Sequence, residues 1–230
     1  MRAMILAAGR GERMRPLTDH TPKPLLQVGG KPLIVWHIER LARAGISDLV
    51  INTSWLGDQI QQTLGDGSRY GARISYSPES TALETAGGIA QALPFFQDQP
   101  FLVINGDVWC DWDPAQAELV AAGLSEDAQA WLLLVDNPPQ HPDGDFRLHA
   151  SGLVADKNAG AGAATFTFAG IGIYRPDLFK DIGEQQAAPL APLLRQAMAA
   201  QHVFGMHHPG QWIDVGTPDR LGQLDKALRC

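Results

Sequence analysis

Short apolar runs alternate with segments of helical periodicity through roughly the first 135 residues, and this alternation restricts the folds open to the chain. Pro94 is expected to end the third of the helical segments. Strands that alternate with helices form largely parallel sheets covered by helices on both faces. The sequence therefore predicts an α/β fold with a Rossmann-like, mixed but mostly parallel sheet. The expected strands are 3–8, 48–54, 72–77, 100–107 and 130–138, and the expected helices are 32–45, 56–65 and 82–94.

The pattern changes in the remaining residues, where strands and helices no longer alternate regularly. Pro138-Pro139 marks the junction, and no linker there is long enough to separate two domains. We therefore predict a single domain with two lobes, 1–137 and a smaller α+β lobe over 138–230. The expected elements of the second lobe are a hairpin over 144–157, a long β-rich run over 164–174, a strand over 203–208, and helices over 191–201 and 217–228.

Charge is unevenly distributed along the 230 residues. The formal net charge of −7 argues against a general nucleic-acid binder. Residues 1–43 nevertheless carry a net charge of +5, against −12 for the remainder. A basic segment on an acidic protein predicts a local anion site. Arg40 and Arg43 are expected instead on the solvated face of a helix, an interpretation that does not extend to the cations of the loop.

The sequence contains no recognisable targeting or membrane segment. The first apolar run, 3–8, is too short for a signal peptide, and no stretch approaches the length of a membrane span. Cys110 and Cys230 are expected to be reduced thiols. We therefore expect a cytoplasmic protein without a membrane or nucleic-acid partner.

Gly9 and Gly11 lie in a glycine-rich loop directly after the first predicted strand, where parallel sheets bind ligands. Met14 stands where a dinucleotide-binding fingerprint needs its third glycine, and the Lys-Ser/Thr of a P-loop is also absent. Glycines still let backbone N–H groups approach an anion, and Arg13 adds a planar cation for phosphate oxygens. The loop therefore predicts a phosphate site; a tight turn with its arginines in solvent is the alternative.

Three further charged side chains stand in unusual settings. Lys23 lies between two prolines that stiffen the backbone around it. Asp107 ends the most apolar strand, and Asp214 stands between Ile213 and Val215, where an unpaired carboxylate is costly. A divalent cation could bridge such carboxylates to phosphates. The alternatives are a solvated lysine, a turn-capping aspartate and a structural ion pair.

The segment "LAAGRGERMRPLTDHTPKPLLQVGGKPLI" resembles the N-terminal signature of the sugar-1-phosphate nucleotidylyltransferases. "NGD" and "WIDVGTP" are similar to the family's two metal-binding segments and follow in the expected order. The resemblance covers essentially the whole chain and implies the nucleotide-diphospho-sugar transferase fold, with a sugar-binding second lobe. It implies an enzyme that uses an NTP and a sugar 1-phosphate, with Mg²⁺ as cofactor. The C-terminal β-helix that many members carry is not expected here.

The resemblance also implies roles for individual residues. Arg13, Lys23 and Asp107 are the implied catalytic residues, and Asp107 and Asp214 the implied Mg²⁺ ligands. The "ETAGGI" stretch, with Gly87 and Gly88, is expected near the nucleoside and sugar. The residues that the resemblance implies to bind the substrates are Gly9, Gly11, Glu12, Arg13 and Lys23 for the triphosphate, Gly88 near the nucleoside and sugar, and Asn105 for the sugar phosphate. Gly144 and Asp145, at the start of the predicted hairpin, are our own candidates for holding the sugar, because Lys157 departs from the family pattern.

Among the short members, the sequence is most similar to those that join UTP to N-acetylmuramate 1-phosphate in peptidoglycan recycling. Members that use GTP and mannose 1-phosphate share most of the matching segments and are the alternative. N-acetylmuramate carries a lactyl carboxylate, for which Arg147 and Arg195 are candidate cations. Lys157 lacks the Glu and Pro that flank the family's sugar-phosphate lysine, so the sequence gives it no certain role.

Two functions from other classes fit the sequence less well. A non-catalytic nucleotide-sugar sensor is disfavoured because the arginine, the lysine and both aspartates are all present, and a dehydrogenase because the third glycine is missing. A monomer or a small homo-oligomer is expected. Arg10 and Arg15 receive no role, and at least one of them is expected to be structural.

Overall fold

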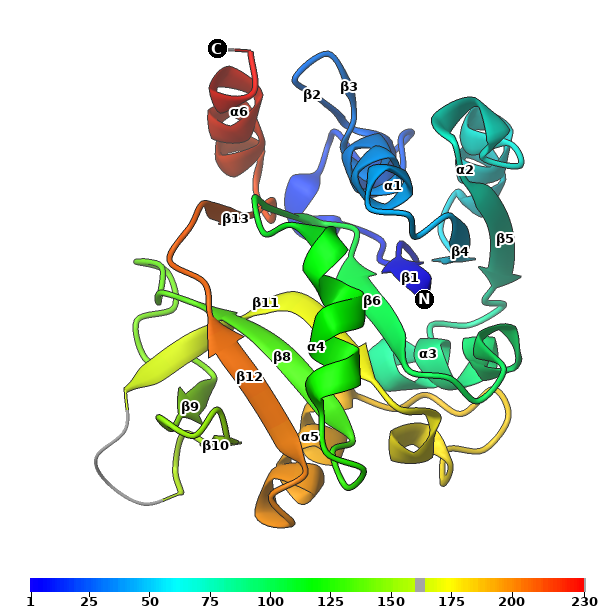
Figure 1. Cartoon of the computed structure of the whole chain (residues 1–230). Helices are drawn as coiled ribbons and strands as arrows, with labels where there is room; N and C mark the ends of the chain where they lie inside the picture. The colour runs from blue at the N-terminus through cyan, green and yellow to red at the C-terminus, as the bar shows by residue number, and fades with distance from the viewer. Residues whose placement is uncertain (160–163, 230) are drawn as a thin grey trace.

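The computed structural model describes residues 1–159 and 164–229 and is built on a nine-stranded sheet (Figure 1). Four neighbouring strands are parallel: β5 (Arg73–Pro78), β4 (Asp48–Thr53), β1 (Arg2–Leu6) and β6 (Phe101–Asn105). Next to β6 lie β11 (Thr165–Tyr174), β8 (Ala130–Val135) and β12 (Val203–His207). Only β11 runs opposite to its neighbours within this row of described strands. The predicted mixed, mostly parallel sheet is confirmed.

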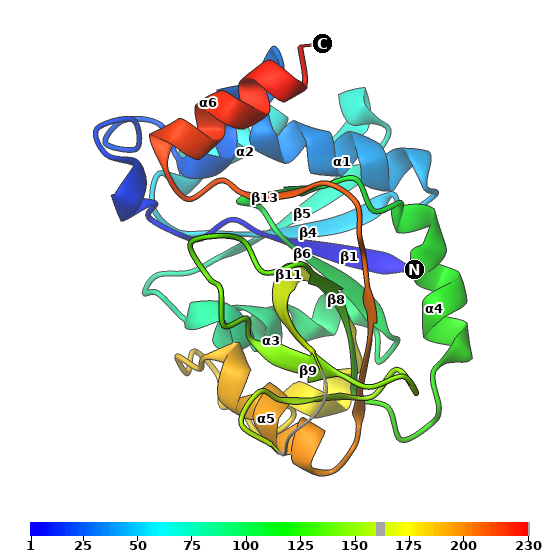
Figure 2. The same cartoon turned by 90° about the vertical axis from the view of Figure 1, so that its left-hand side faces the viewer.

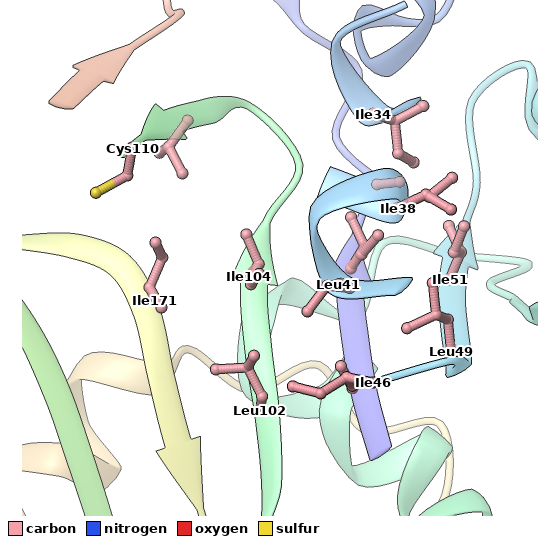
Figure 3. Close-up of a cluster of buried hydrophobic side chains, with 14 of the residues drawn as sticks. Ile34, Ile38, Leu41, Ile46, Leu49, Ile51, Leu102, Ile104, Cys110 and Ile171 are labelled. Atoms are coloured by element: carbon pink, nitrogen blue, oxygen red, sulfur yellow. The ribbon is translucent and has the colours of Figure 1, made fainter. Parts of the chain in front are cut away.

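Helices cover both faces of the sheet because the strands alternate their apolar side chains. In β1, Ala3 and Ile5 belong to the core on one face, and Met4 belongs to the core on the other. Figure 3 shows Ile34, Ile38 and Leu41 packed over the first face. The covering helices, seen above and below the sheet in Figure 2, are α1 (Leu33–Arg43) and α2 (Gly57–Leu64) on the first face, and α3 (Glu84–Phe96) and α5 (Leu190–Ala199) on the second.

Residues 138–230 share the sheet with the first part of the chain. β9 (Phe146–Leu148) and β10 (Val154–Asp156) form the predicted hairpin, and β9 pairs with the start of β11. β11 pairs with β8 on both sides of a register shift between Phe168 and Gly172, while its other edge passes from β9 to β6. The assignment of separate nucleotide and sugar lobes to 1–137 and 138–230 stays a prediction.

A third, smaller core holds the C-terminal helix against the N-terminal part. Its buried residues are Val28, Leu33, Val215 and Leu224. Two short antiparallel pairs lie nearby, β2 (Gln27–Val28) with β3 (Lys31–Pro32) and β7 (Val108–Cys110) with β13 (Trp212–Asp214). The closing helix α6 (Pro218–Ala227) begins at the Thr217 cap, as the sequence predicts. The sequence pattern did not predict the β2–β3 pair or α4 (Ala117–Gly123).

The prediction that Pro94 ends its helix is wrong. α3 continues through Pro94 to Phe96. Phe96 is 1% exposed, and its ring stacks on Phe101 with centroids 3.8 Å apart. We infer that this burial offsets the backbone hydrogen bond that a proline cannot donate.

Within residues 1–159 and 164–229, no helix combines the length and the apolar character needed to cross a membrane. Cys110 is a buried free thiol, and Cys230 lies outside the described residues.

Candidate active site

A cavity of about 680 Å³ opens at the carboxyl ends of β1, β4, β5 and β6. This is the edge at which open parallel sheets bind ligands. Its walls come from the glycine-rich loop and from the residues that follow each strand. They include Gly9, Arg10, Lys23, Asn52, Trp55, Glu79, Thr85, Asn105 and Asp107.

A second cavity of about 250 Å³ adjoins the first, because Asn105 and Asp107 line both. Its other walls come mainly from residues 138–230, with His141, Asp145 and Asp214 among its polar residues. Two ligands bound in these cavities would therefore meet at the turn after β6. This juxtaposition brings together residues from both ends of the chain.

Gly11 holds the glycine-rich loop against its neighbours. Its φ of +68° lies in the left-handed region, and a Cβ there would stand 3.0 Å from Thr18 and 3.2 Å from Lys23. The Thr18 hydroxyl donates to the Gly11 carbonyl at 2.8 Å, and Met14 of the short helix Glu12–Met14 is fully buried. A larger residue at position 11 would strain the backbone and press on Lys23. Gly9 is different, since open space surrounds its Cα at the cavity wall.

Lys23 and Asp107, both predicted from the sequence, form an ion pair between the two cavities. Lys23 Nζ lies 2.6 Å from Asp107 Oδ2, and the lysine side chain is only 8% exposed. Lys23 begins a short helix, Lys23–Leu25, directly after Pro22. The rigid backbone therefore points a nearly desolvated ammonium group at the cavity edge, where Coulomb interactions are stronger than in bulk water.

Asp214 is brought beside Asp107 by strand pairing. Asp214 lies opposite Val108 in the β7–β13 pair, and the Val215 N–H donates to the Asp107 carbonyl at 2.9 Å. Both carboxylates line the smaller cavity and remain partly exposed. Carboxylate oxygens beside a phosphate site are the donors that Mg²⁺ favours, so the chemistry of this pair fits that ion.

Arg13 and Arg220 approach Asp214 from two different segments. Arg220 Nη1 lies 2.9 Å from Asp214 Oδ2. A Cβ at Gly216 would stand 2.5 Å from Arg220 Nη2, 3.1 Å from Arg13 Nη2 and 3.1 Å from Asp214 Oδ1. A side chain at position 216 would therefore press on the Arg220 guanidinium group, which would have to shift. The sequence predicted Arg13 but missed Arg220, which no motif marks.

A buried polar chain forms the floor of the larger cavity. Asn52 Oδ1 accepts from the Ala7 N–H at 2.8 Å, and Asn52 Nδ2 donates to Glu79 Oε1 at 2.7 Å. Glu79 is 7% exposed and also accepts from the Leu83 N–H. A Cβ at Gly88 would stand 2.6 Å from Glu79 Oε1. Gly88 therefore makes room for Glu79, which itself lines the cavity, while direct contact of Gly88 with a nucleoside stays a prediction.

Arg10 and Arg15, which the sequence left without roles, behave differently. Arg10 lines the larger cavity and lies over the Trp55 ring, 4.6 Å from its centroid. Arg15 forms an exposed pair with Asp19 at 3.3 Å, four residues on. Arg15 thus has a local structural partner, whereas Arg10 and Trp55 form a wall of the cavity. Glu12, on the same glycine-rich loop, is exposed.

Asp145 and Asn105 both line the smaller cavity. Asp145 Oδ2 accepts from the Phe168 N–H at 2.8 Å, and Asp145 Oδ1 lies 3.0 Å from His141 Nε2. The preceding Gly144 has φ +60°, where a Cβ would stand 2.6 Å from Asn137 Oδ1. Gly144 therefore shapes the turn that presents Asp145, and its contact with a sugar stays a prediction.

The three basic residues that the sequence offers near the sugar, Arg147, Lys157 and Arg195, have their partners in the hairpin over 144–157. Lys157 Nζ donates to the Gly144 carbonyl at 2.9 Å, and Arg147 Nε donates to the Lys157 carbonyl at 2.8 Å. Arg195 pairs with Asp156 at 2.7 Å on the outside of the hairpin. None of the three lines the two cavities formed by the described residues. Their assignment to a lactyl carboxylate therefore gains no support from this geometry.

Cations and carboxylates at the meeting point of two cavities are typical of enzymes that transfer phosphoryl or nucleotidyl groups, where positioning and charge neutralisation do most of the work. The model of the nucleotidyl transferase family matches residues 2–229, and the chain belongs to this family. The protein is thus a nucleotidyltransferase, as the resemblance implied.

Relatives of known name cover nearly the whole chain. A protein of Neisseria meningitidis serogroup B is 57% identical over 96% of this chain and 95% of its own length, and is named N-acetylmuramate alpha-1-phosphate uridylyltransferase. A protein of Caulobacter vibrioides with the same name is 36% identical over 94% of this chain and 92% of its own length. A mannose-1-phosphate guanyltransferase of Yarrowia lipolytica is 30% identical over 95% of this chain but 61% of its own length.

The fold also matches solved structures. A crystal structure from Bacillus anthracis, provisionally named a glucose-1-phosphate thymidylyltransferase and bound to sucrose, superposes with a TM-score of 0.86 at 22% identity. The superposition covers 100% of this chain and 95% of the Bacillus anthracis chain. At this identity the likeness bears on the fold alone, and it agrees with the predicted nucleotide-diphospho-sugar transferase fold.

Proposed function

We propose that the protein transfers a uridylyl group from UTP to N-acetylmuramate 1-phosphate and releases pyrophosphate. The observation that carries this proposal is the 57% identity, over 96% of the chain, to a protein named for that reaction. The reaction belongs to peptidoglycan recycling, and we place it in the cytoplasm. We propose that a monomer or a small homo-oligomer performs it.

The two adjoining cavities support a simple division of labour. UTP binds in the larger cavity, with its triphosphate along the loop that contains Gly9 and Gly11, and the sugar 1-phosphate binds in the smaller one, beside Asp145. A phosphate oxygen of the sugar attacks the α-phosphorus of UTP and forms a new P–O bond. The bond from the α-phosphorus to the oxygen that bridges to the β-phosphorus breaks, and pyrophosphate leaves.

The residues between the cavities supply the charge that this reaction needs. Asp107 and Asp214 would hold Mg²⁺, which neutralises phosphate charge when it is bound. Lys23 stands at the boundary, where the α-phosphate of UTP meets the attacking phosphate. Arg13 lies beside Asp214 and would bind phosphate oxygens through its planar guanidinium group.

A substrate panel tests the proposal. Purified protein with Mg²⁺ is given UTP, GTP or dTTP together with N-acetylmuramate 1-phosphate, mannose 1-phosphate or glucose 1-phosphate, and pyrophosphate release is followed. We expect the fastest turnover with UTP and N-acetylmuramate 1-phosphate. Faster turnover of mannose 1-phosphate with GTP would overturn the choice of substrates.

Asp107→Asn is the control for the site. The substitution keeps the size of the side chain but removes its charge, so we expect pyrophosphate release to fall by roughly a hundredfold or more, as for loss of one preorganised charged group. Unchanged activity in this variant would falsify the assignment of Asp107 to the metal.

A further inference from the structure

Each of the two aspartates proposed for Mg²⁺ has a cation on its Oδ2 atom. Lys23 Nζ lies 2.6 Å from Asp107 Oδ2, and Arg220 Nη1 lies 2.9 Å from Asp214 Oδ2. Arg13 Nη2 and Asp214 Oδ1 both lie 3.1 Å from the point that a Gly216 Cβ would occupy. Three cations therefore lie near two carboxylates that line the smaller cavity. These five groups by themselves carry one more positive than negative charge.

Arg220 is held in this position by its own helix. Its Nε donates to Thr217 Oγ1 at 3.4 Å, and Thr217 is the residue that caps α6. The Arg220 side chain is 17% exposed and that of Asp214 is 27% exposed. The pair is therefore less screened by solvent and salt than a surface pair.

We propose that Arg220 is a positioning residue that balances the charge of Asp214 and makes metal binding depend on the polyphosphate. This inference rests on the function proposed above. A free divalent cation must compete with Arg220 for the Asp214 carboxylate and approach two guanidinium groups. A triphosphate removes this obstacle, because its oxygens accept from the guanidinium groups in place of the carboxylate. The site thus takes the cation together with the nucleotide in preference to the cation alone.

A purely orienting role for Arg220 gives the opposite expectation. Groups that only orient a metal ligand strengthen metal binding, and their removal weakens it by roughly 10- to 100-fold. If Arg220 competes with the cation, its removal strengthens binding in the absence of nucleotide. The sign of the change in metal affinity therefore separates the two roles.

Mn²⁺ binding, followed by electron paramagnetic resonance without nucleotide and then with UTP, provides the measurement. We expect Arg220→Gln to bind Mn²⁺ more tightly without nucleotide, roughly two- to fivefold, which is the range a partly exposed charge pair is worth. The further tightening on addition of UTP should be smaller than in the parent protein. Arg220→Lys, which keeps the charge, should restore the parent's weak binding. Arg220→Met, a second neutral variant, repeats the test if Arg220→Gln does not fold cooperatively.

Arg229→Gln is the matched control, because Arg229 pairs with Asp225 at 2.9 Å beside the same helix but does not line either cavity. It should leave Mn²⁺ affinity unchanged. Unchanged or weaker Mn²⁺ binding in both neutral Arg220 variants overturns the inference. Asp214→Asn separates this failure from that of the proposed function: if it leaves Mn²⁺ binding unchanged, the metal assignment itself is wrong, whatever Arg220 does.

Discussion

At the scale of single residues, Lys23 is the most confined cation of the site. Its ammonium group is nearly buried and lies 2.6 Å from Asp107 Oδ2. We expect Lys23→Met to lower kcat by roughly 10²- to 10³-fold, the loss that follows removal of one preorganised electrostatic group. The KM for the sugar 1-phosphate should change much less. Pyrophosphate release at saturating concentrations of both substrates checks this.

Lys31→Met is a suitable control for that experiment. Lys31 pairs with Glu39 at 2.5 Å and lies 3.7 Å from the centre of the Trp36 ring, and it does not line either cavity. The kcat of the Lys31→Met variant should equal that of the parent protein. A comparable loss of kcat in both variants would mean that the Lys23 effect is not specific to the site.

The site residues that the sequence predicts share a local signal. Gly9 follows a predicted strand, Asp107 ends one, and Lys23 lies between two prolines, so neighbouring residues are enough to single them out. Arg220 and Trp55 have no such signal. Arg220 is recognised as a site residue only from the turn between β13 and α6, which brings its guanidinium group to Asp214. Trp55 is recognised only because the Arg10 side chain lies over its ring.

At the scale of elements, α1 carries a titratable group into the core. Burial, and secondarily the nearby Arg40, lowers the pKa of His37 from 6.5 to about 4, and its Nε2 has no hydrogen-bond partner among the described residues. The unfolded chain therefore binds more protons than the folded chain between pH 6.5 and pH 4. Stability falls as the pH drops through this window.

Urea unfolding at pH 7 and pH 5 checks this expectation. Between these pH values His37 should cost the parent protein about 2 kcal/mol of unfolding free energy, from the shift of its pKa to about 4. His37→Gln removes the titrating ring, so its loss over the same interval should be smaller by about that amount. Equal losses in the two proteins would contradict the assignment, and the comparison holds even if the variant is less stable at both pH values.

Elements with many buried residues were predictable, and short ones were not. β1, β4, β6 and β8 show near-continuous apolar runs because helices cover both faces of the sheet. The β2–β3 pair has only two residues in each strand, so no periodicity can reveal it. Pro94 alone indicates a helix end because a proline acts on the local backbone, whereas the burial of Phe96 that outweighs it requires the folded core in which Phe96 stacks on Phe101 of β6.

At the scale of the whole molecule, the sheet order is the least predictable feature. Alternating strands and helices predict parallel neighbours, but they do not show that β11 enters antiparallel between β6 and β8. The β11–β6 pairing joins residues about seventy positions apart. The entropy lost in closing so long a loop is offset only by contacts of the complete sheet, so no local pattern reveals the pairing. It also decides the site, because β11 carries Gly170 to the side of Asn105, the residue that lines both cavities.

Gly170→Ala tests whether the position of β11 beside β6 sets the geometry of both substrate sites. Gly170 has φ +73°, and a Cβ there would stand 2.7 Å from Asn105 Nδ2. The left-handed backbone should cost about 1–2 kcal/mol of stability. The displaced Asn105 should lower kcat/KM for both substrates by roughly a hundredfold, as small misplacements of reacting groups do. Thermal unfolding and steady-state kinetics measure the two effects separately.

The double variant distinguishes displacement of Asn105 from a general loss of stability. If Asn105 mediates the effect, Gly170→Ala should cause little further loss of kcat/KM when Asn105→Ala is already present. If the double variant instead loses kcat/KM by the product of the two single-variant losses, Asn105 does not mediate the effect of Gly170→Ala. Gly123→Ala, at the end of α4 where nothing lies within 4 Å of the new Cβ, provides the matched glycine control and should leave kcat/KM unchanged. If Gly170→Ala loses activity through Asn105 and Gly123→Ala does not, the shape of both cavities depends on the contact between Gly170 of β11 and Asn105 of β6.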